Sequence, residues 1–85
     1  MDKVISEIEL IPKGNDSIKV VLNAGETIEG GIERARKELG YKSADIDLLH
    51  EVQQGNLRIY DGFLTDDENM RIETTVHVRF KKCSL

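Results

Sequence analysis

The chain has 85 residues, which is enough for one domain and too few for two. Hydrophobic residues make up 39% of it and charged residues 33%, so the composition is that of a folded globular protein and excludes a disordered chain. The formal net charge is −4 and no apolar run approaches the roughly 18 residues of a membrane-spanning helix, which argues against a general nucleic-acid binder and a membrane protein.

The N-terminal part of the chain predicts a β-hairpin. Residues 4–11 and 17–23 alternate between apolar and polar side chains, and the turn-forming segment PKGND (12–16) lies between them. Alternate side chains of a strand point to the same face, so one face of each strand should be buried. The expected inward residues are Ser6, Ile8 and Leu10 in the first strand and Ile18, Val20 and Leu22 in the second.

Residues 27–40 have the hydrophobic period of a helix. Thr27 is the expected N-cap and Gly40 the expected stop. The side chains spaced for one apolar stripe are Ile28, Ile32, Ala35 and Leu39. Gly30 and Gly31 each cost a helix roughly 1 kcal/mol relative to Ala. They predict either close packing of the helix against the sheet or close approach of a partner's backbone.

Two further strands are expected after the helix, at residues 45–52 and 57–64, with a turn at 53–56 between them. In the first of these, the alternation from Ile46 selects Leu48 as the buried residue and leaves Leu49 outside. The polar segment 65–70 is expected to form one short helical turn.

The last expected strand covers residues 74–80 and alternates cleanly. Its expected inward residues are Thr74, Val76, Val78 and Phe80, and its outward residues are Thr75, His77 and Arg79. The remaining residues, KKCSL, follow no pattern. We therefore expect a single domain over residues 1–82 and a short tail over residues 83–85.

The order strand, strand, helix, strand, strand, short turn and strand predicts an α+β fold of the β-grasp type. We expect a mixed sheet of four to five strands with one helix packed across it. The first and last strands would pair in parallel, which a helical crossover permits.

Two segments carry a resemblance to a known family. The segment TIEGGIERARKELGYKSADIDLLHE (27–51) resembles the helix, connecting loop and third strand of ubiquitin. The segment FLTDDENMRIETTVHVRF (63–80) resembles the closing part of the same family. The resemblance covers roughly residues 4–82 and implies a ubiquitin-like β-grasp domain. Because the chain ends in KKCSL rather than Gly-Gly, it implies a non-conjugated member without a sulfur-carrier role, unless the chain belongs to a longer precursor.

The resemblance also implies a recognition surface on the sheet face. Matched position by position, the family's apolar patch corresponds here to Leu49, His50 and Arg79, with Ile11 or Pro12. Alternation places His77 on the same outward side. Arg79 replaces an aliphatic residue of the family, so a standard ubiquitin receptor is not expected to bind this surface.

A second resemblance supports a different function. The segment AGETIEGGIERARKELGYKSADIDLLHEV (24–52) is similar to the small N-terminal domain of bacterial Jag-type RNA-binding proteins. It implies an RNA-associated domain whose contacts would come from the basic end of the chain: Arg71, Arg79, Lys81 and Lys82. A third hypothesis is an acidic phage-type inhibitor that presents residues 45–68, where acidic residues are concentrated, to a basic target.

No catalytic, metal or cofactor site is expected from the sequence. Cys83 lies near the end of the chain, where nothing would hold a histidine beside it as a nucleophilic site requires. His50 and His77 could be neighbours in a two-histidine metal site, but no third ligand has a fixed spacing. The acidic cluster at 66–68 does not have the spacing of a calcium loop.

The sequence therefore predicts a non-catalytic protein-interaction module, a ubiquitin-like adaptor or accessory subunit of a larger complex. A single cysteine fits a reducing compartment, and the N-terminus lacks the apolar core of a signal peptide, so we expect a cytoplasmic location. The partner's identity and the oligomeric state stay open.

Overall fold

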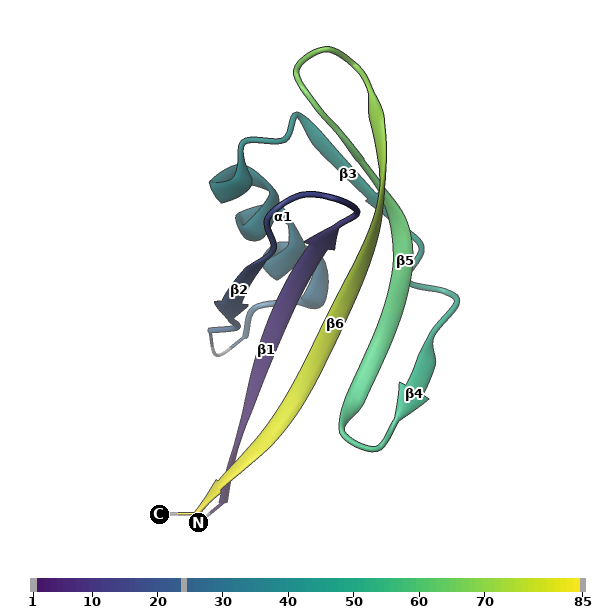
Figure 1. Cartoon of the computed structure of the whole chain (residues 1–85). Coiled ribbons are helices and arrows are strands. Elements are labelled where there is room, and N and C mark those ends of the chain that lie inside the picture. Colours follow the sequence, from purple (N-terminus) through teal and green to yellow (C-terminus); the bar gives the residue numbers. More distant parts are fainter. Residues whose placement is uncertain (1, 24, 85) are drawn as a thin grey trace.

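The computed structural model describes the backbone of residues 2–23 and 25–84, and side chains for residues 6–23 and 25–80. This part of the chain forms one helix and a six-stranded sheet (Figure 1). In chain order the elements are β1 (Asp2–Pro12), β2 (Ile18–Val21), α1 (Ile28–Leu39), β3 (Ser43–Ile46), β4 (Val52–Gln54), β5 (Leu57–Thr65) and β6 (Arg71–Ser84).

The strands lie in the order β2-β1-β6-β5-β3, and β4 pairs with the same edge of β5 as β3 does. Every pair is antiparallel. The longest pairing joins β1 to β6, from Asp2 opposite Ser84 to Pro12 opposite Thr74. Figure 1 shows these two strands running side by side toward the N- and C-terminal ends, in a sheet that curls around α1.

The expected β-grasp fold, with a mixed sheet of four to five strands, is wrong. A β-grasp needs its first and last strands parallel, and here β1 and β6 are antiparallel. The physical reason lies in the hairpins. β5 and β6 follow each other across a tight turn, so they run in opposite directions, and β6 then pairs with β1. The coarser class holds, since one helix packs on one sheet.

The expected third strand at 45–52 is interrupted. β3 and β4 both run antiparallel to β5, with Ile46 opposite Gly62 and Val52 opposite Ile59. They are therefore two parts of one broken strand, and residues 47–51 leave the sheet between them as a bulged segment. We call residues 47–51 the edge bulge. Leu48 and Leu49 lie in this bulge and not in a strand.

The segment at 65–70 is a hairpin turn and not the expected helical turn. Thr65 ends β5, and the main-chain N–H of Asp66 donates to the carbonyl of Met70 over 3.0 Å. The Asp66 carboxylate accepts from the N–H groups of Glu68 and Met70, both at 2.9 Å, and Asn69 has a φ of 64°. An aspartate that folds back on its own backbone stabilises a turn as well as a helix start.

α1 agrees with the sequence prediction at both ends. The Thr27 hydroxyl accepts from the N–H of Gly30 at 3.0 Å, and Gly40 takes a left-handed conformation with a φ of 84°. The helix packs against β1, β2 and β3. The buried apolar core contains Ile8, Leu10, Val20, Ile32, Ala35, Tyr60, Leu64, Val76 and Val78. The predicted inward faces of the first hairpin, the helix and the last strand are thereby confirmed.

The two helix glycines differ. A Cβ atom on Gly31 would lie 2.6 Å from Cδ1 of Ile8, so the close-packing interpretation holds for this glycine. A Cβ atom on Gly30 would lie 3.4 Å from its nearest neighbours, in Glu26 and Thr27, which is ordinary contact. Only Gly31 is therefore required by packing of α1 on the sheet.

The C-terminal residues for which we expected no regular structure continue β6. Its backbone stays paired with β1 as far as Ser84, while Leu85 lies outside the described residues. Within the described part of the chain, no helix is long and apolar enough to cross a membrane.

Candidate functional site

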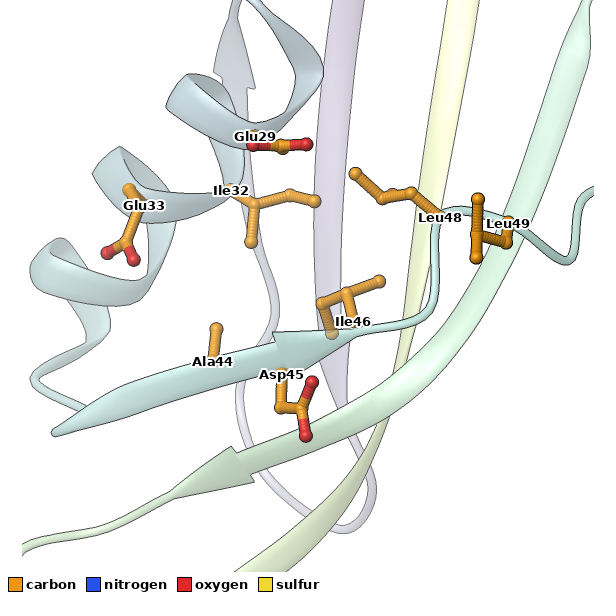
Figure 2. Close-up of a pocket in the computed structure, with 8 residues that line it drawn as sticks. All are labelled: Glu29, Ile32, Glu33, Ala44, Asp45, Ile46, Leu48 and Leu49. Atoms are coloured by element: carbon orange, nitrogen blue, oxygen red, sulfur yellow. The ribbon is translucent and has the colours of Figure 1, made fainter.

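A groove opens between α1 and the edge of the sheet formed by β3 and the edge bulge (Figure 2). Its volume is about 380 Å³. We call it the α1–β3 groove, and its lining residues are Glu29, Ile32 and Glu33 from α1, Ala44, Asp45 and Ile46 from β3, and Leu48 and Leu49 from the edge bulge. Three consecutive parts of the fold thus meet at one surface.

The floor of the α1–β3 groove is apolar. Figure 2 shows the side chains of Ile32, Ile46 and Leu48 pointing toward one another across the space between helix and strand. Ile32 is only 4% exposed, and Ile46 and Leu48 are half-buried against the core. The helix supplies Ile32 because this residue lies on its apolar stripe, and β3 supplies Ile46 because its alternate side chains face the core.

The rim of the groove is acidic. Glu33 is paired with Arg36 at 2.6 Å, and Asp45 lies 4.0 Å from Arg71. Glu29 has no ion-pair partner among the described side chains. The carboxylates of both pairs are exposed, and with Glu29 they leave the rim with a surplus of negative charge, which attracts cationic groups at short range.

The edge bulge is held by Asp47. Its Oδ1 accepts from the N–H of Leu49 at 3.0 Å, and its Oδ2 lies 2.5 Å from Nδ1 of His50. The hydrogen bond with His50 lowers the pKa of Asp47 from its ordinary value of 3.8, and the Leu49 N–H lowers it further. One carboxylate therefore fixes the turn, and Leu49 projects from it with 93% of its surface exposed.

The structure divides the five predicted interaction residues between two places. Leu49 and His50 lie in the edge bulge, beside β5, whereas Ile11 is on β1 and His77 and Arg79 are on β6. The pairing places Ile11 opposite Thr75, which puts Ile11, His77 and Arg79 on the sheet face turned away from α1. A single patch of all five residues is not formed, because β5 lies between β6 and the edge bulge.

The three residues on the outer sheet face have local roles. Arg79 Nη1 donates to Oε1 of Glu9 at 3.0 Å across the strand pair. His77 is half-buried, and within the described part of the chain its Nδ1 atom is buried without a hydrogen-bond partner. Ile11 lines a second groove of about 490 Å³ together with Phe63 and the exposed ion pair of Lys13 and Glu73, which are 3.4 Å apart.

Of the residues that line the α1–β3 groove, the sequence singled out Leu49 alone for an interaction surface, and it did so for the outer sheet face. Glu29 and Glu33 are one helical turn apart on the flank of the stripe that contains Ile32, which is a usable signal. The missing information was the break at Asp47, because an unbroken strand would place Leu49 on the outer sheet face.

The described residues contain no group of three His, Cys, Asp or Glu side chains that could hold a metal ion. Among the described side chains, the carboxylate–imidazole pair of Asp47 with His50 stands on the exposed bulge beside a leucine, and its carboxylate already serves the turn. Comparison of the chain with protein-family models, curated proteins and solved structures gives no match.

Proposed function

We propose that this chain is a non-catalytic protein-interaction domain, an adaptor or accessory subunit that docks through the α1–β3 groove and the edge bulge. The observation that carries the proposal is the position of Leu49. Its side chain is 93% exposed at the lip of an apolar groove, on a turn that Asp47 holds in place.

An exposed leucine is by itself ordinary in a soluble protein. Leu49 differs because it follows Leu48 in the edge bulge and lines the same groove as Ile32 and Ile46. Binding energy in protein interfaces is concentrated in a few apolar anchors beside a pocket, surrounded by polar residues that exclude water. A turn fixed before binding also reduces the conformational entropy that is lost on association.

The contacts of the basic residues give less support to an RNA-associated function. That hypothesis needs free cationic groups at the basic end of the chain. Arg79 is engaged with Glu9, and Arg71 lies over the Phe63 ring at 4.3 Å from its centre. The ion pair with Glu9 offsets the charge of Arg79, and the side chains of Lys81 and Lys82 lie outside the described residues. The single cysteine supports placing the function in a reducing compartment, the cytoplasm.

The test is capture of a partner from the native source by the tagged chain and two matched variants. Leu49→Glu puts a charge at the lip of the groove. Met70→Glu makes the same kind of change at another exposed residue, 60% exposed, in the hairpin between β5 and β6. We expect a stoichiometric protein with the unmodified chain and with Met70→Glu, and its loss with Leu49→Glu. Equal recovery with Leu49→Glu, or recovery of RNA in place of protein, would contradict the proposal.

A further inference from the structure

We propose that the α1–β3 groove binds a basic segment of its partner, in which one large aliphatic or aromatic side chain stands between Lys or Arg residues. This inference rests on the proposed function, since it specifies the chemistry of the partner at that site. It follows from the asymmetry of α1 on the sheet, from the size of the groove and from the charge of its rim.

α1 closes against one edge of the sheet and stays open toward the other. On the β2 side, Arg34 Nη2 donates to the carbonyl oxygen of Val21 at 2.5 Å and is paired with Glu26 at 2.8 Å. On that side Gly31 also packs against Leu22 and Ile8 with no room for a Cβ atom. On the β3 side the helix and strand leave the 380 Å³ groove. A partner can therefore enter between α1 and β3 and reach the half-buried Ile46 and Leu48.

The groove suits a side-chain anchor. Its volume lies at the lower end of the range of roughly 300–1,000 Å³ typical of ligand sites. Ile46 and Leu48, which are half-buried, offer the anchor apolar contact in front of the buried Ile32, and Leu49 lines the groove beside Leu48. A large aliphatic or aromatic residue gains most from such a site because it loses the most apolar surface to water.

The rim specifies what flanks the anchor. Glu29 and Glu33 line the groove from α1, and Asp45 lines it from β3. Acidic residues would be desolvated against an apolar or acidic partner segment, whereas Lys or Arg side chains pair with them and pack their aliphatic stems on the floor. Glu29 has no ion-pair partner among the described side chains, and Asp45 is 88% exposed with Arg71 no closer than 4.0 Å, so each wall keeps one acid that a basic residue beside the anchor can reach.

The second groove, which Ile11 and Phe63 line, does not favour one charge sign in a partner. It is lined by Lys13 and Glu73, which neutralise each other, and by Asp61 beside Ile11 and Phe63. Its charges are mixed. Of these two grooves, the α1–β3 groove has the acidic rim, and its Glu29 has no ion-pair partner among the described side chains.

The test uses a phage-displayed library of random short peptides, selected on the unmodified chain. We expect enrichment of sequences with an aliphatic or aromatic residue between Lys or Arg residues. Synthetic copies of the enriched peptides should bind more weakly at high salt, because the flanking contacts are ionic. Titration with these copies should shift the backbone NMR signals of residues 44–49.

Two charge-reversal variants on the same helix provide the matched pair. Glu29→Lys removes the unpaired acid of the rim, and Glu38→Lys makes the same change at an exposed glutamate that does not line the groove. We expect Glu29→Lys to weaken binding of the enriched peptides at least about threefold and Glu38→Lys to leave it nearly unchanged.

Enrichment of acidic or uncharged peptides, no enrichment at all, or equal binding to both variants would overturn the inference. Each of these results is distinct from failure of the proposed function. A protein partner that is captured by the unmodified chain and lost with Leu49→Glu would keep the function and reject only the basic chemistry. If neither basic peptides are enriched nor a protein partner is captured, both proposals are rejected.

Discussion

Gly62 on β5 and Ile46 on β3 lie so close that a Cβ atom at position 62 would come within 2.6 Å of the Ile46 Cα atom. The main-chain oxygen of Asp45 would be closer still. A glycine inside a strand commonly marks such a close approach of another backbone. β3 therefore keeps its place beside β5, and forms one wall of the α1–β3 groove, because residue 62 has no side chain.

Replacing Gly62 by Ala should destabilise the domain by about 1–3 kcal/mol, as overpacking commonly does. The obstacle is the main chain of β3, which cannot move aside as a side-chain tip can. Gly31→Ala should cost less, because its neighbours are the ends of the Leu22 and Ile8 side chains. Gly30→Ala should stabilise by up to about 1 kcal/mol, since it has room and gains helix propensity. Urea denaturation of the three variants measures this order, and an unchanged midpoint for Gly62→Ala would refute it.

The two leucines of the edge bulge should differ in how much stability their truncation costs. Leu48 packs against the core and Leu49 is almost fully exposed. Leu48→Ala should cost about 1–3 kcal/mol, somewhat below the range for a fully buried leucine. Leu49→Ala should change the free energy of unfolding by under about 0.5 kcal/mol. Chemical denaturation distinguishes them, and a larger loss for Leu49→Ala would mean that the orientation of the bulge is inverted.

Local signals in the sequence predicted local structure well. Thr27 and Gly40 bound the helix because capping depends on residues within one turn. The buried faces of β1, β2 and β6 followed from alternation, which needs no knowledge of the neighbouring strand.

The overall fold depended on interactions between distant residues, which these patterns do not report. The pairing of Glu9 with His77 joins strands from opposite ends of the chain, and its antiparallel direction is invisible in either strand alone. The break at Asp47 was hidden for another reason. The residues around it, from Ile46 to Leu49, are apolar enough to continue a strand, so the side-chain hydrogen bond that ends it was not apparent.

Tyr60 should make stability fall at alkaline pH. Its side chain is 3% exposed and its hydroxyl donates to the carboxylate of Glu51. Burial raises the pKa of Tyr60 above its ordinary value of 10.0, and the hydrogen bond to Glu51 raises it further. Folding therefore favours the neutral phenol. This contribution is fully present below pH 10.0 and is lost as the pH rises through the folded-state pKa.

The variant Tyr60→Phe tests this dependence. It should be less stable than the unmodified chain near neutral pH, by about 1–2 kcal/mol, because a hydrogen bond to a charged group is lost. Between about pH 9 and pH 11 it should lose less stability than the unmodified chain, since it has no phenol to ionise. Urea denaturation at these pH values provides the comparison. Parallel losses in the two proteins would show that other groups control alkaline unfolding.

The pKa of Asp47 should report how the edge bulge is held. His50→Ala removes the largest cause of the lowered pKa of Asp47, so that pKa should rise toward 3.8. It should stay below that value, because the N–H of Leu49 still donates to Oδ1. A lowered folded-state pKa stabilises the bulge above pH 3.8, and this support is lost as the pH falls through the folded-state value.

The measurement is an NMR titration of the Asp47 side-chain carboxyl carbon, with His77→Ala as the control histidine variant. His77 lies on β6, away from the edge bulge, so its removal should leave the pKa of Asp47 unchanged. If His50→Ala has no more effect than His77→Ala, the imidazole does not hold the carboxylate. The hydrogen bond from the N–H of Leu49 to Asp47 would then be the main restraint on Leu49, through which we propose that the chain docks.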